Sequence, residues 1–333
     1  MSFTADSAVV RASAGARSIA ILDLLVAALK RRSPALDGIL TVALCGSLGR
    51  LEATPESDID CIIVLRSGVA AAAVEGALRA IAEVFATVPL RTAKSDGIYR
   101  QPVAVDALLD PGALGSLSET PTTFGKRIQL LLDARPVYDA DAFVDLQSAI
   151  VDWYSSDFLE ADPGASWTYL LNDLARYLHA YAGWQQFKFA RTSDDSWALR
   201  QAKFGSSRLL TFAGLFYLLG ESNHSPHKRE WLKSQLGMTP LARLAAVMIR
   251  YDAPAYDRLQ AAYDTTFALL SDPRVRAALV AGGPDVIQRM RAPIPAELGQ
   301  IRAASTVILQ VLTRFALDRH IDWDPRFFER WLF

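Results

Sequence analysis

Residues 45–52 read CGSLGRLE, and residues 57–64 read SDIDCIIV. The first stretch closes a short apolar run, Ile39–Cys45, that is rich in strand formers, and the second opens another, Asp60–Leu65. A glycine at the end of a strand permits a tight turn and lets the backbone come close to a ligand. The sequence therefore predicts two strands joined through a polar, glycine-containing loop.

Two aspartates mark the start of the second run. Asp58 and Asp60 lie two residues apart where we expect a strand to begin, so their side chains point to the same face of the sheet. Two carboxylates side by side repel each other unless a cation lies between them or one is protonated. Mg²⁺ prefers such oxygen ligands and completes its shell with substrate phosphates. The pair therefore predicts a site for a divalent cation.

The turn before this pair carries groups that suit a phosphate. Gly46 allows close approach of the backbone, Ser47 adds a hydroxyl, and a helix that began here would offer free N–H groups. Arg50 fits two roles, because it can reach a phosphate or pair with Glu52 and lock the loop. From the sequence both roles stay open.

A site for two metal ions needs a third carboxylate, for which Asp106 is the best candidate. It is the one charged residue in the run 103–109 (VAVDALL), which we expect to form most of a third strand at 102–109. An isolated ionised carboxylate in a buried strand is costly without a partner, and a metal ion would supply one. Asp110 is the alternative, but it precedes Pro111 and Gly112, where aspartate is common in turns.

Helical and strand-like patterns alternate along the rest of the first 140 residues. Residues 18–32 and 74–85 carry apolar side chains at helical spacing, and residues 135–138 suggest a fourth strand. From about residue 145 strand-like runs disappear, and long helical patterns punctuated by Pro and Gly follow. We therefore expect an α+β fold with three parts: a flexible N-terminus at 1–17, a small mixed-sheet domain at 18–145 and an all-α helical bundle at 146–333.

Composition excludes several classes of protein. The 333 residues include 35 Lys and Arg against 36 Asp and Glu, a net charge of −1 that argues against a protein that coats nucleic acid. Two cysteines, Cys45 and Cys61, are too few for a disulfide scaffold or a cysteine zinc cluster. No uncharged apolar run approaches the ~20 residues of a membrane span, and Asp23 interrupts the apolar N-terminal segment. We expect a cytoplasmic protein with no membrane partner.

The combination of these residues resembles the nucleotidyltransferase superfamily that includes DNA polymerase β. The shared features are Gly-Ser after a strand, an acid-x-acid pair eleven residues after the serine, and a single acid on a later strand. The fuller pattern, Gly-Ser-x-Gly-Arg-x-Glu at 46–52 and Ser-Asp-Ile-Asp at 57–60, is similar to the branch of glutamine-synthetase adenylyltransferase and PII uridylyltransferase. The resemblance covers roughly residues 38–140, and a helical bundle after the small domain is also common in that superfamily.

The resemblance implies that a nucleoside monophosphate moves from a nucleoside triphosphate, ATP first among them, to a hydroxyl-bearing acceptor, with release of pyrophosphate. By this analogy Asp58 and Asp60 bind two Mg²⁺ ions, and Asp106 joins the ion that activates the acceptor hydroxyl. Gly46 and Ser47 hold the β- and γ-phosphates. The acceptor is a protein side chain, a small molecule or an RNA end, and the neutral net charge favours the first two over long RNA.

The predicted bundle offers further positive charge for a triphosphate. Lys203 and Arg208 flank a segment in which Ser206 and Ser207 suit the N-cap of an apolar helix. The aromatic C-terminus at 323–333 is expected to dock onto the chain's own bundle, with a homodimer or partner contact as the alternative.

Two functions other than catalysis fit the same sequence. One is a nucleotide-binding regulator that kept the phosphate turn but transfers nothing. The other is a helical interaction protein, such as a component of a toxin–antitoxin pair. The presence of all three acids favours the enzyme over the regulator.

Overall fold

Four strands form one mixed sheet in the order β3-β2-β1-β4. β1 (Ile39–Cys45) pairs antiparallel with β2 (Asp60–Leu65) and β4 (Arg135–Tyr138), whereas β3 (Val103–Ala104) runs parallel to β2. Six of the seven β1 residues are buried, as expected for an apolar strand covered on both faces. The computed structural model describes residues 3–91, 99, 101–116, 118–155, 167–191, 197–280 and 296–332.

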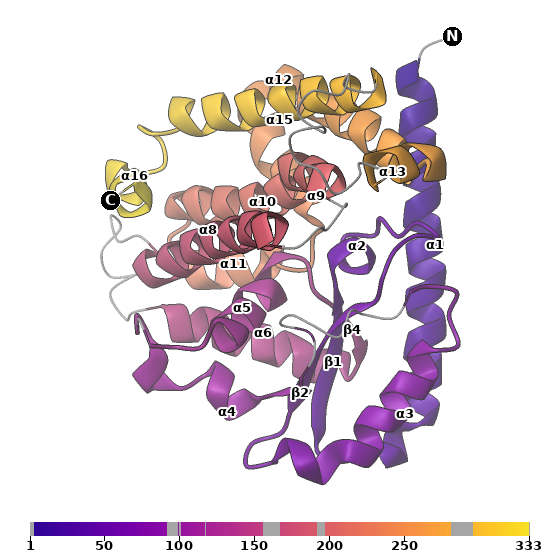
Figure 1. Ribbon diagram of the computed structural model, residues 1–333. Helices are drawn as coiled ribbons and strands as arrows, with labels where there is room; N and C mark the ends of the chain where they lie inside the picture. The colour runs from indigo at the N-terminus through magenta and orange to yellow at the C-terminus, as the bar shows by residue number, and fades with distance from the viewer. Residues whose placement is uncertain are drawn as a thin grey trace. The chain divides into compact units, whose positions relative to one another are not determined.

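Helices cover both faces of this sheet (Figure 1). α1 (Phe3–Arg31) and α3 (Glu75–Phe85) share one apolar core with β1 and β2, which includes Leu25, Leu44 and Ile81. α5 (Pro121–Leu132) and α6 (Ala140–Tyr154) contact β1 from the other face (Figure 1). The apolar stripe predicted at 74–85 is confirmed as the buried face of α3. The sheet is thus a rigid platform for the loops at its ends.

The predicted α+β class is confirmed, because a small mixed sheet is followed by a mostly helical region. The strand expected at 102–109 is shorter than predicted. β3 ends at Ala104, and the chain turns into the short helix α4 (Val105–Leu108). Apolar residues in this run are therefore shared between a strand and a helical turn.

α1 begins at Phe3, so residues 3–17, which we expected to form a flexible N-terminus, are part of a helix. The segment is rich in alanine, which has the most favourable helix propensity. It also has tertiary contacts, since Ser7 and Ala14 are buried and Arg11 forms an ion pair with the largely buried Asp264.

One helical segment among the described residues, Ser7–Arg31 of α1, is long and apolar enough to cross a membrane by length and composition. Of the 18-residue apolar window in this segment, 33% is buried within the structure. Core helices of folded domains and signal sequences pass the same test, so this feature is weak evidence for a membrane span.

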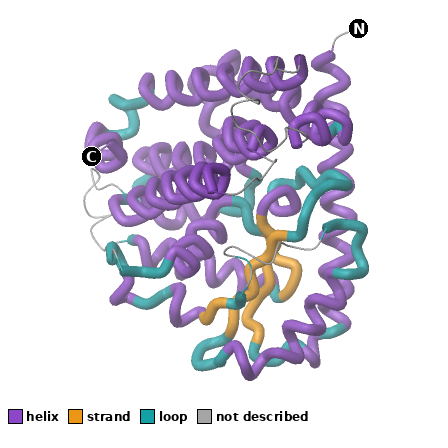
Figure 2. The backbone as a smooth tube through the Cα atoms, viewed as in Figure 1, coloured by secondary structure: helices purple, strands orange, loops and turns teal. Residues whose placement is uncertain are grey.

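Helices account for nearly all of the described chain after β4 (Figure 2). After α6 they are α8 (Thr168–Arg191), α9 (Trp197–Lys203), α10 (Leu209–Glu221), α11 (Lys228–Gln235), α12 (Pro240–Ser271), α13 (Pro273–Val280), α15 (Ala296–Asp318) and α16 (Pro325–Leu332). The all-helical character predicted for this part of the chain is confirmed for the residues described.

The chain divides into two compact units, and residue 145 lies inside one of them rather than at a boundary in the sequence. The sheet unit comprises Ala14–Leu174, Leu218–Thr239 and Asp324–Phe333, and the helical unit comprises Met1–Ser13, Ala175–Tyr217 and Pro240–Trp323. α6 spans the predicted boundary and lies wholly in the sheet unit, because it packs against β1, β4 and α5.

Within the helical unit, α12 and α15 pack along each other. α12 is kinked at Asp252, whose side chain accepts a hydrogen bond from the Ala255 N–H at 2.9 Å and so caps the second half of the helix. Trp323 packs on Tyr217 and Phe315, with ring centroids 5.2 and 6.1 Å away.

The aromatic C-terminus is buried by the chain itself. Trp323 and Phe327 are fully buried and Phe328 nearly so. In the described part of the tail these rings thus pack within the chain, and Asp324–Phe333 belongs to the sheet unit.

Candidate functional site

Asp58 and Asp60 lie where β2 begins. Between them Ile59 is only 2% exposed and belongs to the core shared with α1 and α3, so in extended backbone the two aspartates point to the opposite face. Arg91 fixes this backbone on one side. The Ile59 N–H donates to the carbonyl of Arg91 at 3.0 Å, and the Arg91 N–H donates to the carbonyl of Ser57 at 3.1 Å.

The Gly46–Ser47 turn lies directly across the sheet ladder from this pair. β1 ends at Cys45, which is paired with Asp60, and the chain then enters the short helix α2 (Gly46–Gly49). Gly46 has a φ of 66°, and a Cβ atom there would lie 2.9 Å from Oδ2 of Asp60. Only glycine combines this conformation with so close an approach. The structure thus brings together four predicted site residues: Gly46, Ser47, Asp58 and Asp60.

Arg50 holds the loop in place through two carboxylates and is not free to bind a phosphate. Its Nε donates to Glu52 at 2.8 Å and its Nη1 donates to Asp133 at 2.7 Å. The arginine side chain is 14% exposed, and the two carboxylates are more deeply buried still. Because two carboxylates balance its charge, the guanidinium is not available as the main cation for a triphosphate. The expectation that Arg50 binds nucleotide is therefore not supported by its contacts.

Asp106 does not join the aspartate pair, so the predicted three-carboxylate cluster is wrong. Ala104 is paired with Leu65 at the far end of β2, and the Asp106 carboxylate accepts a hydrogen bond from the Gly68 N–H at 2.9 Å. About 16 Å of extended strand separate Leu65 from Asp60. The Gly68 N–H and the hydroxyl of Ser67 lower the pKa of Asp106. This carboxylate thus has hydrogen-bond donors without a metal.

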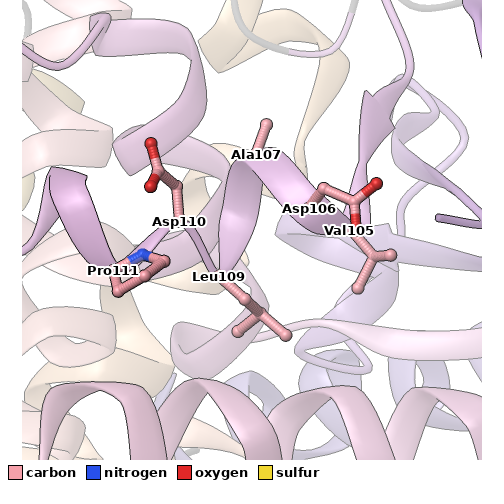
Figure 3. Close-up of a pocket in the computed structure, with 6 residues that line it drawn as sticks. All are labelled: Val105, Asp106, Ala107, Leu109, Asp110 and Pro111. Carbon is pink, nitrogen blue, oxygen red and sulfur yellow. The ribbon is translucent and has the colours of Figure 1, made fainter. Parts of the chain in front are cut away.

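Asp110, the alternative third acid, has ordinary turn chemistry. Its side chain accepts a hydrogen bond from the Gly112 N–H at 2.9 Å. Asp106 and Asp110 line an open hollow of about 610 Å³ around α4, where their carboxylates point away from each other (Figure 3). This hollow lies beyond the end of β2 opposite to Asp60 and is separate from the Gly46–Ser47 turn.

The remaining acid pair still fits a magnesium ion that arrives with a nucleotide. In the part of the chain that the structure describes, no group of three His, Cys, Asp or Glu side chains converges on one point. Mg²⁺ commonly takes only one or two carboxylates from a protein and completes its shell with waters and substrate phosphates. Asp58 and Asp60 beside a glycine turn supply that number of ligands.

Residues 22–103 match the family model of the nucleotidyltransferase domain. The resemblance noted from the sequence is thus confirmed at the level of the domain. The match includes Gly46, Ser47, Asp58 and Asp60, and it ends before Asp106. No curated protein was found to match the chain.

Lys203 and Arg208 lie in the helical unit, outside the segment that matches the nucleotidyltransferase domain. The predicted helix start between them is wrong, because a π-helical turn at Phe204–Arg208 joins α9 to α10. The Ser206 hydroxyl donates to the carbonyl of Ala202 at 2.6 Å instead of capping a helix. Arg208 stacks on the ring of Tyr181, 4.2 Å from its centroid.

Sequence reasoning missed Lys126, a buried cation of the sheet unit. Its side chain comes from α5, is 1% exposed and donates to the carbonyl of Gln101 at 2.5 Å. Burial lowers its pKa to about 8, and the thiol of Cys61 on β2 partly offsets this. The sequence feature that could have predicted its burial is the apolar end of α5, which follows Lys126. A charged residue in a helix that is buried on most sides is itself buried.

Replacing Lys126 with Met is expected to change how stability depends on pH. In the wild type the folded pKa is below the ordinary 10.5, so the unfolded chain binds more protons between about pH 8 and 10.5. Lys126 by itself therefore contributes a rise in the free energy of unfolding with pH in that window, by about 3 kcal/mol at most. Lys126→Met should remove the rise and be more stable at pH 7. Urea titrations at pH 7, 9 and 10.5 test this, and a variant with the wild-type pH slope would contradict it.

Both cysteines are expected to resist thiol reagents in the folded protein. Burial raises the pKa of Cys45 well above its ordinary value, with further contributions from the carboxylates of Asp133 and Asp60. Burial and the carboxylate of Asp60 raise the pKa of Cys61 to about 12. The thiolate is the reacting form, so its fraction at pH 8 is of order one in ten thousand for Cys61. Ellman's reagent should label two thiols in urea and none within minutes in buffer, and prompt native labelling of either would contradict these raised pKa values.

Proposed function

We propose that the chain transfers a nucleoside monophosphate from a nucleoside triphosphate to a hydroxyl-bearing acceptor and releases pyrophosphate. The observation that carries this proposal is the placement of Asp58 and Asp60 directly across the β1–β2 ladder from the Gly46–Ser47 turn. The match of residues 22–103 to the nucleotidyltransferase domain supports the same reaction.

In this proposal the aspartates of the strand bind the metal ion, and the residues of the turn bind the phosphates. Asp58 and Asp60 would hold Mg²⁺, which when bound lowers the pKa of an attacking hydroxyl and neutralises charge on the phosphates. The Gly46 backbone allows the phosphates to approach closely, and the half-buried Ser47 is placed to donate a hydroxyl hydrogen bond to them. The rigid β1–β2 ladder keeps these groups in register.

The proposal also includes the chemical class of the acceptor. A net charge of −1 provides little attraction for long RNA, so a protein side chain or a small molecule is favoured. ATP is the first nucleotide to test.

Labelled nucleotides test the reaction even while the acceptor is unidentified. The protein is incubated with Mg²⁺, cell extract and each of the four ribonucleoside triphosphates, labelled either at the α- or at the γ-phosphate. The α-label should appear on an acceptor and the γ-label in pyrophosphate. Transfer of the γ-label to the acceptor would indicate a kinase instead, and transfer of neither label would refute the proposal.

One observation favours a second candidate, a nucleotide-binding regulator that transfers nothing. Asp106 lies at the other end of β2, and the described residues hold no third acid beside Asp58 and Asp60. The two candidates differ in a simple pair of measurements. A regulator would show a rise in unfolding temperature with triphosphate and Mg²⁺ but no label transfer, whereas the enzyme would show both.

A further inference from the structure

The Gly46–Arg50 turn is held at several points by the junction between α5 and β4. The carboxylate of Asp133, the residue that ends α5, accepts hydrogen bonds from the Gly46 N–H and from the Arg50 guanidinium, the latter at 2.7 Å. Two residues further on, Arg135 donates from Nε to the carbonyl of Gly49 at 2.8 Å. The junction thus contacts the beginning, the middle and the end of the turn.

The contact at Gly49 leaves no room for a side chain. A Cβ atom there would lie 1.8 Å from the carbonyl oxygen of Asp133 and 2.9 Å from that of Leu44. Backbone and side chain of Asp133 therefore meet the turn together.

The turn needs such support because the residue directly after it has an unfavourable backbone conformation. Leu51 has a φ angle of 62°, whereas Gly46 at the start of the turn has a φ of 66°, which glycine adopts readily. A non-glycine residue with positive φ persists only where the surrounding structure determines its conformation. Asp133 supplies part of that determination from 83 residues away in the sequence.

The cost of the arrangement indicates a role beyond stability. Asp133 is 4% exposed, and its side chain is 1% exposed in the ion pair. Burying an ion pair requires desolvation that offsets much of the attraction, so apolar residues of similar size are often as stabilising. A buried pair does, however, fix the direction of the groups that it joins.

We infer that Asp133 is a positioning residue of the candidate site, whose carboxylate and backbone hold the Gly46–Arg50 turn where a triphosphate lies against it. This inference rests on the proposed function. Asp133 is too deeply buried to touch a nucleotide itself, so it acts through Gly46 and Arg50.

Variants at both ends of the ion pair test the inference. Asp133→Asn, Arg50→Gln and the double variant are compared with the wild type by calorimetric titration of α,β-methylene-ATP and Mg²⁺. Each single variant should weaken binding by about tenfold or more, since a small misplacement of a binding group has effects of that size. The double variant should bind no worse than the weaker single variant, because both changes break the same contact. Asp133→Asn alone leaves Arg50 paired with Glu52, so it keeps the test available if Arg50→Gln or the double variant fails to fold.

Glu119→Gln is the matched control. Glu119 pairs with the fully buried Arg127 in the same unit but does not touch the turn. At a comparable loss of unfolding temperature it should bind the nucleotide within about twofold of wild type, as expected for sites with no shared partners. Equal weakening in Glu119→Gln and Asp133→Asn, or wild-type binding by Asp133→Asn, would overturn the inference.

Amide hydrogen exchange separates this inference from the proposed function. Residues 46–52 should exchange faster in Asp133→Asn than in Glu119→Gln whether or not nucleotide is present. If the wild type binds no nucleotide, the proposed function fails, while faster exchange still supports the positioning role. Unchanged exchange of 46–52 in Asp133→Asn overturns the inference even where the wild type binds nucleotide.

Discussion

Asp60→Asn is expected to reduce transfer of the α-label by roughly a thousandfold or more, and Asp58→Asn by a similar factor, since each removes a carboxylate from the proposed magnesium site. Both residues lie where β2 begins, and the Asp60 carboxylate lies beside Gly46. Asn keeps the size of the side chain, so the fold should be preserved. Initial rates of label transfer, with unfolding temperatures measured alongside, give the result.

Asp106→Asn serves as the control within the same domain. Its carboxylate lies near Gly68 at the opposite end of β2, so transfer should stay within about threefold of wild type. If Asp58→Asn and Asp60→Asn kept wild-type rates, the assignment of the active site would fail. If Asp106→Asn lost as much as they do, the structural correction to the third acid would fail.

Gly49→Ala is expected to destabilise the sheet unit by about 3 kcal/mol or more. The added Cβ atom would lie 1.8 Å from the backbone oxygen of Asp133, and neither backbone can yield without moving α2 or the α5–β4 junction. Chemical denaturation followed by circular dichroism measures the loss.

Gly76→Ala is the matched substitution at an open position. Gly76 lies in α3, and a Cβ atom there meets nothing within 4 Å, so alanine should stabilise the helix by about 0.5–1 kcal/mol. Equal effects of the two substitutions would contradict the close contact between Gly49 and Asp133.

The parts of the fold that follow from local patterns were predictable from the sequence. β1 and β2 are short apolar runs bounded by glycine and polar residues, and α3 is a regular apolar stripe. The acid pair and the glycine turn were predictable for the same reason, because each depends on residues close together in the chain.

The third acid could not be placed in this way. The apolar residues around Asp106 are compatible with a strand of eight residues, whereas the structure has a two-residue strand paired with the far end of β2. Register between distant strands depends on tertiary packing, which a local pattern does not determine. The second partner of Arg50 could not be predicted for the same reason. Asp133 lies 83 residues away in the sequence, whereas Glu52 lies only two residues away.

Two errors concern helix boundaries. Residues 3–17 lack a clear apolar stripe, yet their alanine content and the Arg11–Asp264 pair keep them helical. Ser206 and Ser207 are typical N-cap residues, yet they lie inside a continuous helical segment and donate to carbonyls four residues earlier.

Binding of Mn²⁺ tests the central claim most directly. Free Mn²⁺ is measured by electron paramagnetic resonance during titration of the wild type and of the Asp58→Asn/Asp60→Asn double variant, each with and without α,β-methylene-ATP. We expect nucleotide to increase Mn²⁺ binding to the wild type and to have no such effect on the variant beyond that of nucleotide alone. Equal nucleotide-dependent Mn²⁺ binding by both proteins would contradict the claim that these two aspartates hold the metal.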